Sequence, residues 1–230
     1  MKRHKDNATP ESRPSETTRL EAFSDGVFSI AITLLVLELI QFLHPQNSEP
    51  LLQSFKHHWQ PFLAFIIGFV TILVCWINHH HAFDYINKVD GKFMWVNGFL
   101  LFMVTVTPFS TAIFAEFLKT EGKMAVAIFG FNFFLIAIAA YSICAYAYKK
   151  FLVDEASRDF FYCLKSAYAY SIAYTLVSFF ICFLSIPVSI LLYMLLFAVF
   201  AFPKEVATVL LKRKNRIKNK IKAAVPLANS

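Results

Sequence analysis

The sequence predicts an all-α, polytopic membrane protein with six transmembrane helices and both termini in the cytoplasm. Three observations predict this class. Of the 230 residues, 57% are hydrophobic and only 16% are charged, whereas a soluble domain carries roughly 25% charged residues. The charges gather in the first 25 residues, the last 27 residues and a few short connectors. The apolar stretches between them are long enough to cross a bilayer, which takes about 20 helical residues.

Four apolar stretches and one stretch of double length supply the six predicted spans. The first four spans cover residues 26–43, 61–77, 93–115 and 124–148. Residues 166–202 then form a single uncharged run of 37 residues. As one helix this run would measure about 55 Å, far more than a hydrocarbon core of about 30 Å. Pro187 is the natural break, because proline interrupts a helix, and it divides the run into a fifth span and a short sixth span.

The distribution of Lys and Arg predicts the orientation of these spans. Of the 22 basic residues, 19 fall on the side of the two termini, and only Lys56, Lys119 and Lys123 fall on the opposite side. Basic residues concentrate on the cytoplasmic side of membrane proteins. The expected location is therefore the plasma membrane, or the inner membrane of a bacterial cell. The basic residues that give the net charge of +7 flank the membrane segments. This charge therefore predicts no nucleic-acid partner.

The chain divides into three predicted segments. Residues 1–18 form a basic leader that we expect to be disordered, because it is polar and charged. Residues 19–211 form the six-helix transmembrane domain, and residues 212–230 form a basic cytoplasmic tail. The tail either lies on the inner leaflet as an amphipathic helix that binds anionic lipids or is a solvated segment that only fixes the topology.

Two neighbouring stripes run along the first predicted span. One is apolar, with Ile30, Leu34 and Leu37, and the other is small and mildly polar, with Gly26, Ser29 and Thr33. Each set recurs at the three- or four-residue spacing that places side chains on one helix face. In an oligomer with this helix at its axis, one stripe would line a pore and the other would make subunit contacts. Glu38 beyond them is either a cation attractor at the pore mouth or an interfacial carboxylate.

Polar residues mark the cytoplasmic ends of the first and second spans. Arg19, Ser24 and Asp25 open the first span, and His79 and Asp84 close the second. Helix capping by Ser24 or Asp25 is one complete account of this start. The other interpretation is a polar cluster at the membrane surface that includes all five residues.

The run His79 to His81 predicts no metal site, because consecutive helical residues point about 100° apart. Four cysteines without a CxxC pair predict neither a metal nor a disulfide, and we expect no cofactor. Thr105, Thr107 and Asn132 lie at membrane depth and suggest hydrogen bonds between helices. The chain shows no nucleotide-binding loop, nucleophile elbow or pair of intramembrane carboxylates, so the sequence does not predict an enzyme.

The start of the first span resembles a known channel family. Arg19, Phe23, Ser24 and Asp25 match the RxxxFSD signature of the lysosomal and endosomal potassium channel family, transmembrane protein 175 and its relatives. The stretch Trp76-Ile-Asn-His-His resembles the polar end of that family's second helix. The length and span count resemble the bacterial branch with one six-helix repeat per chain, which implies a homotetramer.

The resemblance implies a function for the first span. In that family the first helix lines the pore, and rings of bulky apolar side chains constrict it. Carried over, the rings are Ile30, Leu34 and Leu37, and Thr33 matches a position where some bacterial members use hydroxyls for selectivity. The expected function is a cation channel with a modest preference for K⁺ over Na⁺. A secondary transporter is the alternative, and a membrane scaffold without transport is a third interpretation.

Overall fold

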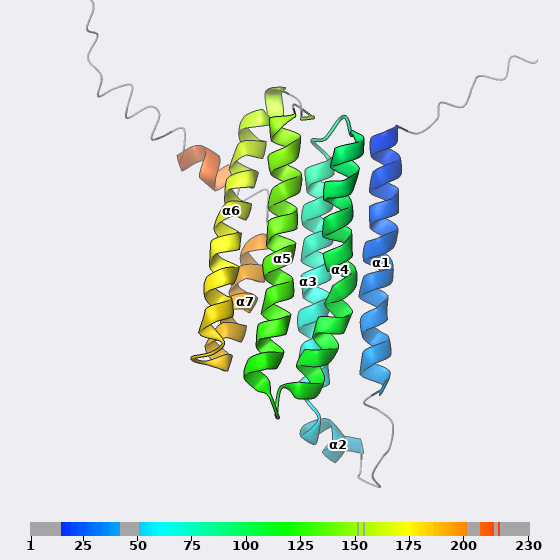
Figure 1. Cartoon of the computed structure of the whole chain (residues 1–230), viewed down its shortest axis with the longest axis vertical. Coiled ribbons are helices and arrows are strands. Elements are labelled where there is room, and N and C mark those ends of the chain that lie inside the picture. The colour runs from blue at the N-terminus through cyan, green and yellow to red at the C-terminus, as the bar shows by residue number, and fades with distance from the viewer. Residues whose placement is uncertain are drawn as a thin grey trace, which may run out of the picture.

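The computed structural model describes residues 15–41, 51–150, 152–153, 155–201, 208–213 and 216. Its elements are α1 (Glu16–Gln41), α2 (Leu51–His57), α3 (Gln60–Phe83), α4 (Gly91–Phe117), α5 (Gly122–Lys149), η1 (Glu155–Ser157), α6 (Arg158–Ile181) and α7 (Ile186–Phe200). Figure 1 shows them as an upright bundle, with α2 below it. An isolated bridge between Ile86 and Val153 is the one β-type pairing among the described residues. The all-α prediction is confirmed for this part of the chain.

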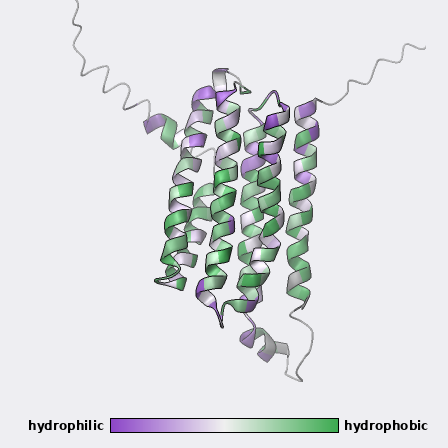
Figure 2. Cartoon of the chain, in the orientation of Figure 1, coloured by the Kyte–Doolittle hydropathy of each residue, from purple (hydrophilic) through white to green (hydrophobic). Residues whose placement is uncertain are grey.

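Apolar helices of sufficient length make this a multi-pass membrane arrangement. By length and composition, α1, α3, α4 and α5 can each cross a membrane. Figure 2 shows hydrophobic residues along the middle of the bundle and hydrophilic residues toward its ends. Helix α7 has 15 residues and measures about 22 Å, which is less than a hydrocarbon core of about 30 Å. As far as the structure describes it, α7 is therefore too short to cross the membrane on its own.

The long apolar run at residues 166–202 is broken where the sequence predicts. Helix α6 ends at Ile181, and α7 begins at Ile186 after a tight turn. Pro187 lies in the first turn of α7, where its missing N–H costs no helical hydrogen bond. Figure 1 shows that α7 runs back alongside α6. The two predicted segments are thus a helical hairpin.

Helix α1 lies at one edge of the bundle. It packs against α3 and α4, while α5 packs against α4, α6 and α7. Helix α7 lies among α3, α5 and α6 and contacts all three. Figure 1 shows α1 at the end of this arrangement, with α6 and α7 at the other. The edge position leaves one side of α1 without a neighbour from the described part of the chain.

The two ends of the described chain lie at the same end of the bundle. Helix α1 begins there at Glu16, inside the predicted leader of residues 1–18, and residues 208–213 form a helical segment near the same level (Figure 1). Residues 1–14 and most of the predicted tail of residues 212–230 lie outside the described residues. The ends of α3 and α5 are at this end too (Figure 1). Two sets of lysines therefore lie at opposite ends of the bundle. The end at which α1 begins carries Lys88, Lys92, Lys149 and Lys150, and the other end carries Lys56, Lys119 and Lys123.

Helices α5 and α7 approach closely at a glycine. A Cβ atom placed on Gly130 would overlap the hydroxyl oxygen of Tyr193 and lie 2.8 Å from its Cζ. Tyr193 is almost fully buried, at 1% exposure, and its ring packs edge-on against Phe133. The ring therefore fills the space that the missing side chain of Gly130 leaves.

We predict that Gly130→Ala destabilises the bundle, because overpacking a filled site typically costs about 1–3 kcal/mol. The double variant Gly130→Ala/Tyr193→Phe should recover part of that loss, since it removes the atom nearest to the new methyl group. Thermal unfolding in detergent measures both. Gly98→Ala is the matched control, because a Cβ there meets nothing within 4 Å. Equal melting temperatures for Gly130→Ala and Gly98→Ala would contradict the assignment.

Asp90 caps helix α4 and ties it to α5. Its Oδ1 atom accepts a hydrogen bond from the Phe93 amide at 2.7 Å. The Tyr146 hydroxyl donates to Oδ1 at 3.0 Å and to Oδ2 at 2.8 Å. The hydrogen bond from the Phe93 amide, followed by that from Tyr146, holds the pKa of the Asp90 carboxyl below its usual range. The ionised carboxylate is therefore the form that the folded chain prefers.

A lowered pKa stabilises the fold at pH values above the unfolded pKa of about 3.9, and the effect is lost as pH falls through the folded value. We therefore expect Asp90→Ala to lower the melting temperature by a constant amount from about pH 5 to pH 8. The difference from the wild type should shrink only below about pH 4. Asp90→Asn is the control, because it keeps a capping oxygen without a titrating group. A difference that grows as the pH falls would refute this assignment.

A candidate pore-lining helix and its polar anchor

One face of α1 is buried against its neighbours. Ser24, Phe28, Ala31 and Leu35 recur every three or four residues, and each is 2% exposed or less. This spacing places the four side chains on one helix face, which packs toward α3 and α4. The buried stripe therefore sets the rotation of α1 about its axis.

The predicted pore residues lie on the uncovered side of α1. Ile30 is 61% exposed, Leu34 is 41% exposed and Leu37 is 55% exposed. Thr33 is exposed as well, and its hydroxyl donates to the Ile30 carbonyl at 2.8 Å. Gly26 in the neighbouring small stripe is also exposed. A single chain therefore leaves both stripes open to a neighbour. The side chain of Glu38 lies outside the described part of the structure.

A buried relay of hydrogen bonds anchors the N-terminal half of α1. The Asn97 amide nitrogen donates to the Ser24 hydroxyl oxygen at 2.9 Å, and that hydroxyl donates to the Leu20 carbonyl at 2.8 Å. The Asn97 carbonyl oxygen lies 2.9 Å from His79 Nε2. Because this oxygen can only accept, Nε2 carries the proton. One residue of α4 thus joins α1 to α3.

Two further contacts join α1 to α3 at the same level. The indole N–H of Trp76 donates to Asp25 Oδ1 at 2.9 Å. His80 Nδ1 lies 3.1 Å from Glu21 Oε1. The relay and these contacts together form the polar anchor of α1. The anchor fixes the helix at three points on one side, so that the opposite side stays free.

The structure brings together part of the cluster that the sequence predicts. Ser24 and His79 meet through Asn97, and Asp25 contacts α3 through Trp76. Asp84 lies one turn beyond, exposed, with its carboxylate 3.4 Å from His81 Nδ1.

Arg19 is exposed, and no ion pair joins it to Asp25 among the described residues. The sequence does not predict Asn97 as a member of this cluster. A buried amide within the apolar run of residues 93–115 was the signal that could have found it.

The other polar groups at membrane depth make contacts between helices. The Asn132 amide of α5 donates to the Thr107 hydroxyl of α4 at 3.0 Å, as predicted for these two residues. Thr105 is exposed and bonds only to a carbonyl of its own helix. The three histidines point to different partners, and within the described residues no group of three His, Cys, Asp or Glu side chains could hold a metal ion.

Comparisons with known proteins agree with the resemblance seen in the sequence. The family described as "Endosomal/lysosomal potassium channel TMEM175" matches residues 19–108, which include most of α1, the polar anchor and most of α4. A potassium channel of Chamaesiphon minutus is 38% identical over 180 residues, which cover 76% of this chain and 89% of that relative. A potassium channel of Streptomyces collinus is 36% identical over 125 residues, which cover 54% of this chain and 60% of that relative.

A solved structure matches the fold. The crystal structure of a lysosomal potassium-selective channel TMEM175 homolog from Chamaesiphon minutus superposes with a TM-score of 0.74 at 36% identity. The match covers 82% of this chain and 98% of that chain. The family resemblance predicted from Arg19, Phe23, Ser24 and Asp25 is therefore confirmed.

We predict that Asn97→Ala lowers the free energy of unfolding by about 2 kcal/mol or more, because it leaves buried groups on Ser24 and His79 without partners. Unfolding in detergent micelles measures this loss. Asn87→Ala is the matched control, since Asn87 is exposed in the connector between α3 and α4 and surface substitutions usually stay within about 0.5 kcal/mol. Similar losses for the two variants would show that the relay does not hold α1.

Proposed function

This chain belongs to the TMEM175 family of ion channels, and from that premise we propose that it is a potassium-permeable channel whose pore is lined by α1. Membership also makes the chain a channel protein and not an enzyme, as the sequence predicts. The relatives from Chamaesiphon minutus and Streptomyces collinus are both named potassium channels. The exposed stripe of α1 is the single observation that carries the pore assignment.

The proposed channel is a homotetramer with four copies of α1 around a central axis. One α1 helix at the edge of a bundle cannot enclose a pore, so copies of the chain must supply the rest of the wall. Ile30, Leu34 and Leu37 are large apolar side chains that remain 41–61% exposed in a single chain. Symmetric contacts around a closed axis would cover such a face in every subunit.

In this assembly the apolar stripe forms stacked constrictions. Rings of Ile30, Leu34 and Leu37 side chains repel water and act as a hydrophobic barrier. An ion must shed much of its hydration shell to pass such rings, and K⁺ does so at lower cost than Na⁺. Thr33 places a hydroxyl beside these rings. The proposed selectivity for K⁺ is therefore modest, because no ring of backbone carbonyls replaces the lost water.

The polar anchor determines which side chains reach the axis. A helix turns by about 100° per residue, so a rotation by one residue position would move Ile30 and Leu34 off the axis. Ser24, Asp25 and Glu21 contact α3 and α4 on the opposite side of the helix. The anchor thus acts as a positioning device for the rings and does not contact the ion.

The proposed orientation places both termini in the cytoplasm. The end of the bundle at which α1 begins carries most of the basic residues among the described ranges (Figure 1). Basic residues favour the cytoplasmic face. We place the channel in the plasma membrane, or in the inner membrane of a bacterial cell, with the basic tail against anionic lipid.

We predict that Leu34→Ala raises K⁺ flux severalfold and lowers the preference for K⁺ over Na⁺, because it widens an apolar ring. Ile30→Asn should act in the same direction by hydrating the constriction. Flux into liposomes and reversal potentials of the purified protein measure both effects. Leu176→Ala is the matched control, since it makes the same change at a side chain that is 39% exposed on α6, which does not contact α1.

Two outcomes would overturn the pore assignment. Unchanged flux and reversal potential in Leu34→Ala and Ile30→Asn would show that the stripe does not line the pathway. A monomer in lipid, measured by subunit counting, would exclude a central axis altogether. Equal flux of K⁺ and Cl⁻ would refute a cation channel.

A further inference from the structure

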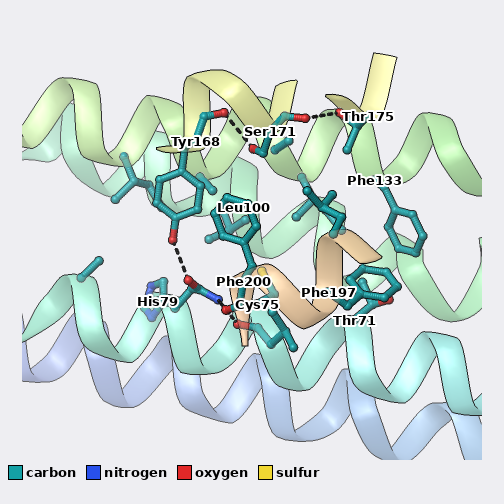
Figure 3. A pocket seen from close by; sticks show the side chains of 18 of the residues that line it. Thr71, Cys75, His79, Leu100, Phe133, Tyr168, Ser171, Thr175, Phe197 and Phe200 are labelled. Atoms are coloured by element: carbon teal, nitrogen blue, oxygen red, sulfur yellow. Dashed lines mark hydrogen bonds between the residues drawn. The ribbon is translucent and has the colours of Figure 1, made fainter. Parts of the chain in front are cut away.

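A cavity of about 90 Å³ lies inside the bundle, away from α1. Its walls come from α3, α5, α6 and α7, and Leu100 of α4 completes them. Figure 3 shows Tyr168, Cys75, Phe197 and Phe200 around this space. Most of the lining is apolar, and the cavity is not sealed from the outside of the bundle. It is therefore a second feature of the fold, separate from the exposed stripe of the first helix.

The lining of the cavity extends past the last residue of α7. Helix α7 is the element that contacts α3, α5 and α6 together, and it ends at Phe200. The Phe200 carbonyl accepts a hydrogen bond from the Asn78 amide at 2.8 Å. The lining continues along α3 beyond this point, to Ala82. The helix that separates α3 from α5 and α6 thus stops before the space between them ends.

The polar side chains of the lining are already engaged within the protein. The Tyr168 hydroxyl donates to Asn78 Oδ1 at 3.2 Å (Figure 3). The hydroxyls of Thr71, Ser171 and Thr175 donate to carbonyls of their own helices. Among the described residues, His79 Nδ1 is the one polar side-chain atom of the lining that is buried without a partner. The space therefore presents hydrocarbon to its contents and suits an apolar ligand better than an ion.

The lining of the cavity extends along two helices. Its lining runs from Thr71 to Ala82 on α3 and from Phe133 to Cys144 on α5. Each of these segments spans about 16 Å at 1.5 Å per residue. An extended hydrocarbon chain follows such a lining better than a compact ring does. The surrounding bilayer supplies such chains at this depth.

A cation lies next to the end of the cavity that faces the start of α1. Lys165 is three residues before Tyr168 on α6 and within electrostatic reach of Cys144, which lines the cavity. Its ammonium group lies 4.8 Å from the centre of the Tyr148 ring. It forms no ion pair with any described residue. A cation at the membrane surface attracts the headgroup of an anionic lipid.

We propose that this cavity binds one acyl chain of an anionic membrane lipid, whose headgroup lies beside Lys165. The acyl chain lies in the space that α3, α5, α6 and α7 line. This inference requires that the bundle is embedded in a membrane, but it does not require that α1 lines a pore. Its test therefore uses no ion flux, and its failure leaves the channel proposal intact.

The test is photolabelling of the full-length protein in vesicles. The probe is phosphatidylglycerol with a diazirine in the part of one acyl chain nearest the headgroup, and mass spectrometry locates the adducts. We expect adducts at Ile143 and Cys144, which are 2% and 1% exposed and out of reach of lipid around the bundle. Adducts confined to outward-facing residues such as Phe180 and Leu184, which are 60% and 85% exposed, would overturn the proposal.

Variants that fill the cavity with a larger side chain provide the matched comparison. Ala140→Phe places a ring in the lining and should lower the yield at Cys144 at least tenfold, with an unchanged yield at Phe180. Ala169→Phe makes the same change on the exposed face of α6 and should alter neither yield. If Ala140→Phe does not fold, Ala137→Leu fills the same wall with a smaller group. Equal yields in a folded cavity variant and the wild type would refute the site.

The headgroup is tested with Lys165→Gln. One basic residue near the membrane surface contributes about 1 kcal/mol of attraction, which is about a fivefold change in binding. We expect the yield from phosphatidylglycerol at Cys144 to fall about fivefold and that from a phosphatidylcholine probe to stay the same. An equal fall for both probes, or none for either, would contradict recognition of an anionic headgroup.

Discussion

The rotation of α1 depends on a single buried amide. Asn97 is fully buried between Ser24 and His79 and bonds to both. In a membrane interior a polar group without a partner costs several kcal/mol. Only one rotation of α1 brings the Ser24 hydroxyl to Asn97 while His79 also meets it. The relay therefore converts a requirement for hydrogen bonding into a fixed helix orientation, and the direction of every other α1 side chain follows.

Side-chain size imposes the same orientation farther along α1. A Cβ atom on Gly68 of α3 would lie 3.1 Å from Leu35 Cδ2 and 2.9 Å from Thr111 Oγ1. The glycine thus lets Leu35 of α1 and Thr111 of α4 approach the α3 backbone closely. Ala31, at 0% exposure, continues the contact toward Ser24. Polarity fixes the first half of α1 and close packing fixes the second, and both turn Ile30 and Leu34 away from the bundle.

Much of the fold follows from the sequence, because span positions depend on length and hydropathy alone. The hairpin at Pro187 and the exposed stripe of Ile30 and Leu34 follow from local rules of the same kind. The pairing of Trp76 with Asp25 does not, since it depends on how two helices are rotated and shifted against each other. Asn97 was missed for the same reason. Periodicity gives the faces of a helix but not the partner that each face meets.

His79 contacts both the polar anchor of α1 and the cavity. Its Nε2 atom is held by Asn97 in the anchor of α1, while the same residue lines the cavity that α7 leaves open. Its ring stacks on Phe83 with centroids 4.3 Å apart and also meets Phe28 of α1. An acyl chain in the cavity would pack against a side chain that is already fixed on its other side. His79 therefore contacts both the cavity and the anchor of α1. A ligand in the cavity could influence the orientation of α1 through this residue of α3.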